Sequence, residues 1–379
     1  MAKIAGVALF LIASAAFGYS QSGRRAEPAP SPLPVSVNDP SEYSESRPAR
    51  RRPLAPAVIR QQATQTAAAR SSQAANPVTM SDEGDVLRVE TDLITVPVSV
   101  FDRNGLYVPN IRRSEFRIFE DGVEQEIAYF GTEDKPFTVV LMLDTSLSTA
   151  YRIEEIRQAA MAFVDQLRSQ DSVMVIEFNG SIKVRTELTN DRSRIFKAIQ
   201  KANFGSGTSL YDAVNQALRR RLSSVSGRKA VVLFTDGVDT TSRRASYDST
   251  LSLAEEADAM IFPIYYNTFT WNRPRLGFPE ILSPVGTRPE DYALGRKYLE
   301  ELSEYTGGRI FRPESTPGGL TAAFEGIAEE LRRQYNIGYI PAKRGNPGDR
   351  KLITVRVNRP NLNIRARDSY IVGSSATAQ

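Results

Sequence analysis

The feature that most constrains the fold of this chain is a seven-residue run, Phe137 to Leu143, that leads directly into Asp144, Ser146 and Ser148. A strand-like run of this length without alternation is typical of a central parallel strand covered on both faces. Polar residues that follow such a strand lie at the carboxyl edge of the sheet, where open α/β sheets bind ligands. One carboxylate and two hydroxyls at alternate positions suit Mg²⁺, Ca²⁺ or Mn²⁺ rather than a soft metal.

Residues 137–334 continue this pattern as alternating strands and helices. Repeated β-α units require a mostly parallel, doubly wound sheet with helices on both faces. We therefore predict an α/β domain over residues 135–334. Its later strands are predicted at 173–178, 182–186 (an edge strand), 230–234, 260–266 and 309–311, and its last helices at 247–258, 291–305 and 319–334.

The α/β domain is flanked by two segments with β patterns, residues 85–133 and 335–373. Residues 93–101 alternate between apolar and polar side chains, and Asp121-Gly122 predicts a turn that pairs strand 116–120 with strand 126–130. Neither flanking segment is large enough to form a complete sandwich alone. We expect the two segments to pair into one small β-sandwich-like unit, with the α/β domain inserted between them.

The first 80 residues have the sequence pattern of an export signal followed by a spacer. Residues 1–21 combine Lys3, an apolar run of about 14 residues and small residues at several cleavage registers, which is typical of a signal peptide. An uncleaved N-terminal membrane anchor is the alternative. Residues 22–80 are rich in Pro, Ala and Arg and poor in large apolar residues, so we expect a disordered linker. The protein is then periplasmic or extracellular.

Composition excludes several classes of function. The chain contains no cysteine and no histidine, which rules out disulfides, thiolate zinc sites, Cys nucleophiles and His-based triads. The net charge is +4, but Lys3 and residues 22–80 carry more than this excess, so residues 81–379 are nearly neutral. A nucleic-acid partner therefore has little electrostatic support.

Two further segments place oxygen ligands at the predicted carboxyl edge. Asp236 follows the apolar strand 230–234, and Thr208 lies in a glycine-rich loop that opens a helix. Together with Asp144, Ser146 and Ser148 they make a site of two carboxylates and three hydroxyls. So few charges leave room for water and for one open position, and near-octahedral, partly hydrated coordination at ~2.1 Å fits Mg²⁺ best, with Ca²⁺ and Mn²⁺ as alternatives.

These segments resemble the metal-ion-dependent adhesion site of von Willebrand factor A domains. The matching motifs are Asp144-x-Ser146-x-Ser148, Gly207-Thr208 and Thr235-Asp236-Gly237, in that order and at strand ends. The flanking segments Val96–Val100, Phe119–Gly122 and Thr306–Arg309 also resemble a bacterial VWFA-related family catalogued in acidobacteria. Leu147 and Thr149 stand where relatives commonly carry Gly and Met; neither is a metal ligand, so the departures concern the shape of the loop.

The resemblance implies a mechanism for binding a partner. The aspartate and two serines matching Asp144, Ser146 and Ser148 bind the ion, and the positions matching Thr208 and Asp236 ligate it directly or through water. An acidic side chain of a partner protein then fills the open coordination position. We therefore expect an exported, metal-dependent, adhesion-like protein-binding module rather than an enzyme.

Other interpretations of the same residues remain open. Asp144, Ser146, Ser148 and Thr208 are also suitable helix caps, and Asp236 is a suitable turn residue. A structural or assembly factor with a merely stabilising ion is a second interpretation. A Mg²⁺-dependent phosphoryl-transfer enzyme is a third, although Ser146 stands where such an enzyme needs a second carboxylate and Gly205-Ser206-Gly207 lacks a phosphate-loop ending. The long loop 267–290, with its aromatic residues, either contacts a partner or packs back on the domain.

Overall fold

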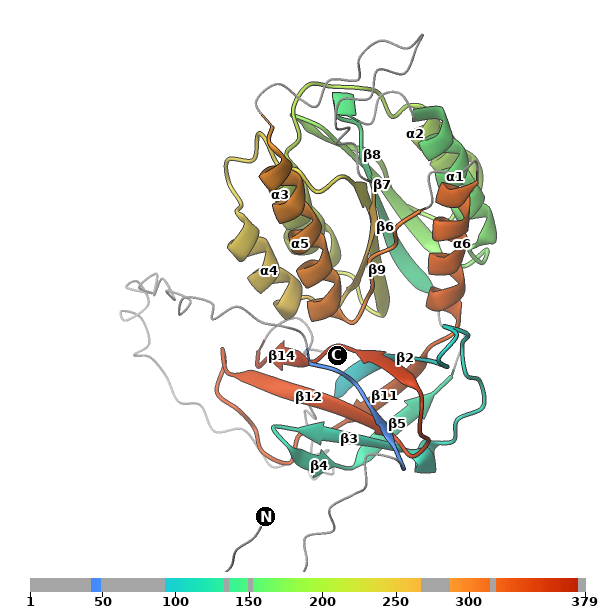
Figure 1. Cartoon of the computed structure of the whole chain (residues 1–379), viewed down its shortest axis with the longest axis vertical. Coiled ribbons are helices and arrows are strands. Elements are labelled where there is room, and N and C mark those ends of the chain that lie inside the picture. The colour runs from blue at the N-terminus through green and yellow to red at the C-terminus, as the bar shows by residue number, and fades with distance from the viewer. Residues whose placement is uncertain are drawn as a thin grey trace, which may run out of the picture. The chain divides into compact units, whose positions relative to one another are not determined.

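The computed structural model describes residues 42–48, 93–132, 136–148, 153–266, 287–313 and 318–373. Its α/β domain is built on a five-stranded sheet in the order β10-β9-β6-β7-β8, with only the edge strand β8 antiparallel to its neighbour. β6 is the middle strand, as its apolar sequence predicts (Figure 1). The strands are β6 (Phe137–Asp144), β7 (Ser172–Phe178), β8 (Ile182–Thr189), β9 (Arg228–Thr235) and β10 (Met260–Tyr265).

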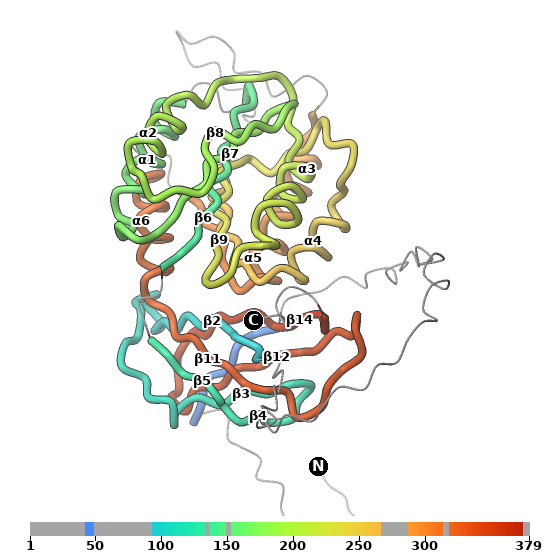
Figure 2. The backbone as a smooth tube through the Cα atoms, turned by 180° about the vertical axis from the view of Figure 1, so that it is seen from behind, coloured from blue at the N-terminus to red at the C-terminus, as the bar shows by residue number. Residues whose placement is uncertain are grey.

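Helices cover both faces of this sheet (Figures 1 and 2). Val139, Leu141 and Leu143 of β6 pack into a core with α1, α2 and α6, whereas Val140 and Met142 pack into a second core with α3, α4 and α5. The helices are α1 (Ile153–Gln166), α2 (Arg192–Gln200), α3 (Leu210–Asn215), which continues as the π-helical segment η3 (Gln216–Leu222), α4 (Tyr247–Glu256), α5 (Pro289–Thr306) and α6 (Gly319–Arg332). The predicted doubly wound α/β class is confirmed.

The segments on either side of the α/β domain form two antiparallel sheets around a third core. One sheet has the order β13-β2-β11-β5, and the other has the order β1-β12-β3-β4 with β14 also paired to β12. Each sheet therefore combines strands from both ends of the chain. The strands are β1 (Ser44–Glu45), β2 (Ile94–Phe101), β3 (Phe116–Glu120), β4 (Val123–Gln125), β5 (Ile127–Gly131), β11 (Tyr335–Tyr339), β12 (Arg350–Val357), β13 (Asn363–Ala366) and β14 (Ser369–Ile371), with a 3₁₀ turn at Arg113–Glu115.

Three local predictions are wrong. β3 turns at Asp121-Gly122 into the short strand β4, while β5 leaves this hairpin and pairs with β11 in the other sheet. The predicted strand 309–311 is a single bridge between Phe311 and Ile264. The linker 22–80 is not wholly without order, because β1 pairs with β12. Composition did not predict this last pairing, since it depends on the backbone groups that the edge of β12 offers.

Several predictions lie outside the described residues. They concern the signal peptide 1–21, most of the linker 22–80 and residues 267–286 of the long loop. Within the described part of the chain, no helix combines the length and the apolar character that a membrane crossing requires.

Buried carboxylates join the sandwich to the α/β domain. Glu255 of α4 accepts hydrogen bonds from Arg350 of β12 at 2.5 Å and from Ser369 of β14 at 2.7 Å. Glu330 of α6 accepts a hydrogen bond from Arg365 of β13 at 3.3 Å. Burial of a carboxylate is costly unless it is paired and hydrogen-bonded, so these contacts hold the two parts in register.

Candidate functional site

The first group of predicted ligands lies at the carboxyl end of β6. Asp144 is completely buried as the last residue of the strand, and Ser146 and Ser148 are 1% and 3% exposed. The Asp144 carboxylate accepts a hydrogen bond from the backbone N–H of Ser146 at 2.9 Å, which folds the loop back over the strand end. The hydroxyls of Ser146 and Ser148 are 2.9 Å apart. The loop thus gathers one carboxylate and two hydroxyls at one place.

Asp236 directly follows β9, the neighbour of β6 in the sheet, and is 1% exposed. One carboxylate oxygen of Asp236 accepts from the Val238 N–H at 3.1 Å, which closes a tight turn. Burial and the nearby charge of Asp236 raise the pKa of Asp144 to about 7, while hydrogen bonds from Thr235 and Ser146 act in the opposite direction. Two buried carboxylates that repel one another favour the entry of a cation.

Thr208 lies in the loop between α2 and α3, which is held against the end of β6. Gly205 donates its N–H to the Thr145 carbonyl at 3.0 Å, and Ser146 forms a parallel bridge with Gly205. The buried side chain of Asn179, just after β7, donates to the Thr145 hydroxyl at 3.1 Å. A Cβ on Gly205 would come within 2.4 Å of that Asn179 amide, so glycine is required for the close approach.

The loop after β9 fixes Thr208 from the other side. The Thr208 N–H donates to the Thr240 hydroxyl at 2.8 Å, and the Thr208 carbonyl accepts from the N–H groups of Thr240 at 2.8 Å and Thr241 at 3.0 Å. Gly237 has a positive φ of 82° and lies against the backbone of Gly295 in α5, where a Cβ would come within 2.7 Å. Backbone contacts therefore connect all three loops, 144–148, 203–209 and 235–242, which we call the carboxyl-edge loops.

The structure places all five predicted residues in the carboxyl-edge loops. Hydrogen bonds bring Asp144, Ser146 and Ser148 together, and Asp236 lies near enough for its charge to raise the pKa of Asp144. Thr208 is joined to the loop after β9 through its backbone. Which residues bind an ion stays a prediction.

Sequence reasoning missed three residues that shape the site. Thr235 donates its hydroxyl to Asp144 at 2.7 Å, Asn179 donates to Thr145 in the loop of Ser146 and Ser148, and Thr240 holds the loop that carries Thr208. Thr235 had a signal, because it directly precedes Asp236 at a strand end. Asn179 and Thr240 had none, since their partners are 34 and 32 residues away.

The donor set fits a hard divalent cation. Asp144 and Asp236 offer carboxylate oxygens, and Ser146, Ser148 and Thr208 offer hydroxyl oxygens, all less than 4% exposed. Oxygen ligands of this kind suit Mg²⁺ and similar ions. Within the described residues no cluster of three or more carboxylates is found, so such an ion would depend on hydroxyls and water for most of its ligands.

Comparison with known proteins identifies the domain. Residues 138–273 match the family model of the von Willebrand factor type A domain. No curated protein sequence matches the chain.

Similar solved structures include the vWF domain of the type V pili tip protein Mfa5 from Porphyromonas gingivalis, with 14% identity over 52% of this chain and 95% of that chain and a TM-score of 0.40. A von Willebrand factor type A protein from Catenulispora acidiphila has 13% identity over 77% of this chain and 78% of that chain, with a TM-score of 0.41. The PilB minor pilin from Streptococcus sanguinis has 13% identity over 53% and 62%, with a TM-score of 0.40. This chain contains a von Willebrand factor type A domain, a module that mediates interactions between proteins.

Proposed function

We propose that this protein is an exported, metal-dependent protein-binding module. The observation that carries the proposal is the pair of buried carboxylates, Asp144 and Asp236, beside the hydroxyls of Ser146 and Ser148 at the carboxyl edge of the sheet. This arrangement concentrates negative charge where water is excluded, and such a place favours a divalent cation. Mg²⁺ is the ion that the small number of charged ligands suits best.

Asp144, Ser146 and Ser148 would hold the ion, with Thr208 and Asp236 completing its surroundings directly or through water. When bound, the ion supplies a Lewis-acidic position for a carboxylate of a partner protein. The chain's own part is to hold these oxygens in place. Thr235 orients the Asp144 carboxylate, Asn179 supports the loop of Ser146 and Ser148 through Thr145, and Thr240 fixes the loop of Thr208.

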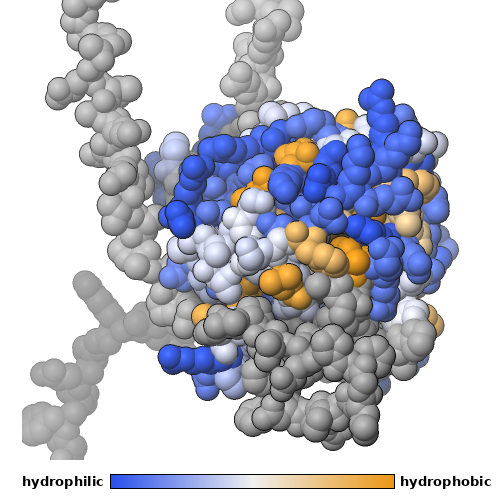
Figure 3. All heavy atoms as spheres, turned by 90° about the horizontal axis from the view of Figure 1, so that it is seen from above, coloured by the Kyte–Doolittle hydropathy of each residue, from blue (hydrophilic) through white to orange (hydrophobic). Residues whose placement is uncertain are grey.

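Apolar side chains next to the site favour a particular kind of partner. Leu147, between the two serines, is 60% exposed, and Phe204, next to Gly205, is 44% exposed. The Ser146–Gly205 bridge brings their two loops side by side. Apolar patches among hydrophilic residues are seen on the face viewed from above (Figure 3). We infer a partner segment in which an acidic residue adjoins a large apolar one, because exposed aromatic and aliphatic anchors contribute strongly to interfaces.

Export is part of the proposal and is supported by the N-terminal sequence. The short basic start, the apolar run and the small residues of 1–21 are typical of a secretory signal. The Pro- and Arg-rich residues that follow would separate the binding module from the site of export or anchoring.

The test uses a displayed library of random peptides selected on the mature protein in Mg²⁺ and eluted with chelator. The expected result is a set of peptides with Asp or Glu next to Leu, Ile or Phe, whose binding disappears in Asp144→Ala. Binding that ignores the chelator would contradict the proposal and favour a structural or assembly factor. Turnover of a phosphate ester that is lost in Asp144→Asn would instead show an enzyme.

A matched variant separates the two parts of the proposal. Leu147→Ser with Phe204→Ser is expected to leave Mg²⁺ affinity unchanged but to weaken the selected peptides at least tenfold. If the peptides bind this variant as tightly as they bind the wild type, Leu147 and Phe204 do not contribute to peptide binding. The proposal of metal-dependent binding would then still stand.

A further inference from the structure

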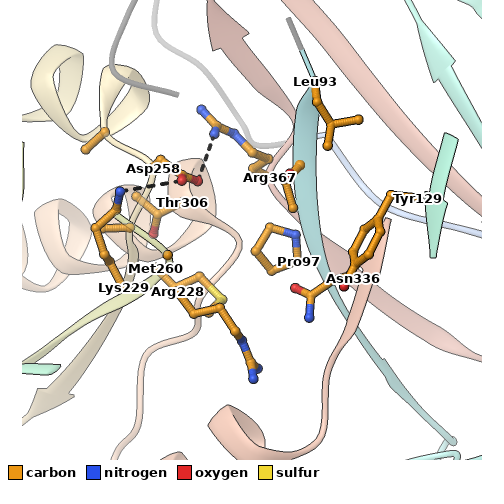
Figure 4. Close-up of a pocket in the computed structure, with 14 residues that line it drawn as sticks. Leu93, Pro97, Tyr129, Arg228, Lys229, Asp258, Met260, Thr306, Asn336 and Arg367 are labelled. Carbon is orange, nitrogen blue, oxygen red and sulfur yellow. Dashed lines mark ion pairs between the residues drawn. The ribbon is translucent and has the colours of Figure 1, made fainter. Parts of the chain in front are cut away.

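A cavity of about 270 Å³ lies at the opposite edge of the α/β sheet from the carboxyl-edge loops (Figure 4). Its lining includes Arg228 and Lys229 at the start of β9 and Met260 at the start of β10. Thr95, Pro97 and Asn336 line it from the sandwich. Because strands β9 and β10 run from this cavity toward the other edge, the cavity is a separate place from the proposed metal site.

The outer face of one sandwich sheet provides a wall of this cavity. Tyr335, Ile337 and Tyr339 of β11 pack into the sandwich core. Strand alternation therefore sends Asn336 and Gly338 to the outer face, with Pro97 of β2 paired beside Asn336. The sheet is thus buried on both faces along β11.

Glycines make room on this face for an aromatic ring. A Cβ on Gly131 would come within 2.6 Å of the Tyr129 hydroxyl oxygen, and a Cβ on Gly338 within 3.0 Å of the Tyr129 Cβ. Tyr129 lines the cavity, and Figure 4 shows it beside Asn336. The two glycines therefore allow the Tyr129 ring to pack closely on the sheet where it lines the cavity.

Polar groups in the cavity lack partners. Asn336 is only 5% exposed, and among the described residues its side-chain amide has no hydrogen-bond partner. Thr95 is half-buried and pairs with Gly338, two residues along β11 from Asn336, and among the described residues its hydroxyl has no hydrogen-bond partner either. The polar atoms of both side chains are not fully buried but accessible from the cavity, so they can hydrogen-bond a molecule or water that occupies it.

The opposite wall carries an excess of basic side chains. Lys229 and Arg367 are each 5% exposed, and both contact Asp258, at 3.6 Å and 3.5 Å (Figure 4, dashed lines). Asp258 is the only acidic residue in a lining that also includes Arg228. Neutral oxygens also hold these side chains: Lys229 donates to the Val225 carbonyl at 2.9 Å, Arg367 to the Ser369 carbonyl at 2.9 Å and Arg228 to the Leu331 carbonyl at 2.8 Å. Such bonds do not cancel charge, so the excess of positive charge in the described lining favours an anionic group, and most of the remaining lining is apolar.

We propose that this cavity binds a small organic anion, a carboxylate on an apolar body of one ring or a short alkyl chain. A cavity of 150 Å³ holds benzene, so this one accommodates roughly eleven non-hydrogen atoms. The apolar body contacts Pro97, Tyr129 and Met260. The carboxylate accepts hydrogen bonds from the Asn336 amide and the Thr95 hydroxyl and faces the basic wall. Such a ligand contacts the α/β domain and the sandwich at once.

The test is titration of the mature protein with 3-phenylpropionate, followed by the methyl NMR signals of its methionines. Saturable shifts are expected at Met260, identified through Met260→Leu, and they should persist in chelator and in Asp144→Ala. Asn336→Leu and Thr95→Phe should each weaken binding at least tenfold, while Asn363→Leu, the matched change on an exposed position of the same sheet, should not. Thermal unfolding of each variant checks that it is folded.

Three results would overturn the proposal. The first is the absence of saturable binding to the wild type, and the second is equal binding by Asn336→Leu and Thr95→Phe; either would leave only water in the cavity. The third is equal affinity for 3-phenylpropan-1-ol, the neutral analogue, which would exclude an anionic ligand.

Discussion

Buried carboxylates at the two edges of the α/β sheet have charged neighbours of opposite sign. At the amino edge and the adjoining helix ends, Glu255 and Glu330 meet arginines of the sandwich, at 2.5 Å from Arg350 and 3.3 Å from Arg365. At the carboxyl edge, Asp144 accepts from the Thr235 hydroxyl and the Ser146 N–H, and its nearby charge is that of another acid. Neutral donors orient a carboxylate without cancelling its charge.

This difference separates a structural role from a binding role. A buried carboxylate that faces an arginine joins two parts of the molecule, and removing either partner destabilises the fold. A buried carboxylate that faces a second carboxylate is repelled by its negative charge, and a bound cation offsets this repulsion. Substitutions at the amino edge should therefore act on stability, and those at the carboxyl edge on metal affinity.

The largest effect is expected from Asp144→Asn. The change keeps the shape of the side chain but removes a charge from the proposed ligand set, so Mg²⁺ affinity should fall by roughly 100-fold or more. Without metal, the melting temperature should not fall, because repulsion with Asp236 is relieved. Calorimetric titration and thermal unfolding measure the two quantities.

Asp239→Asn is the matched control, because Asp239 lies at the same edge of the sheet, in the loop after β9, but accepts hydrogen bonds from the Tyr211 N–H and the Ser242 hydroxyl. It should leave Mg²⁺ affinity close to that of the wild type. Equal affinities of Asp144→Asn and the wild type would remove the distinction between the two edges.

Glu255→Ala should have the opposite pattern. Glu255 is 1% exposed and bonds to two sandwich residues, so its loss should lower the free energy of unfolding by about 2 kcal/mol. Mg²⁺ affinity should stay within about twofold, because the contact lies at the other edge of the sheet. Urea unfolding and calorimetry test both statements.

The neighbouring Glu256 is exposed, and Glu256→Ala supplies the control, with little change in stability. If both variants unfold at the same urea concentration as the wild type, the carboxylates of the amino edge do not hold the two parts together.

Asn179→Ala should give the smallest change. It removes the side-chain hydrogen bond to Thr145, which supports the loop of Ser146 and Ser148. Support of this kind is typically worth 10-fold or more in metal affinity, so we expect about tenfold weaker Mg²⁺ binding. Asn190→Ala, at an exposed position, should have no effect. An unchanged affinity in Asn179→Ala would mean that backbone contacts alone position the 144–148 loop.

Much of the α/β domain could be predicted because its signals are local. Buried parallel strands are continuous apolar runs, and the residue after each run lies at the carboxyl edge whatever the remainder of the fold. Asp144 and Asp236 could therefore be assigned to one edge from sequence alone. The glycines of the 203–209 loop likewise marked the place of Thr208.

The β-sandwich was less predictable because its strands pair across long separations. The Asp121-Gly122 turn was recognised, but its second strand is β4 rather than 126–130, since β5 pairs with β11, about 210 residues later. The pairing of β1 with β12 had no local signal at all. Strand partners depend on which edges remain open once the domain has folded.

The sequence by itself determined the fold class of residues 135–334 and the chemistry available at the end of β6, because both follow from hydrophobic periodicity and from the absence of His and Cys. Only the tertiary structure decided what surrounds those oxygens and what faces the other edge. Asn179, Thr235 and Thr240 reach the site through folding, and the unpartnered amide of Asn336 becomes notable only when the sandwich packs over Lys229. Periodicity specifies which face a side chain occupies, but the contacts on that face are formed by segments distant in sequence.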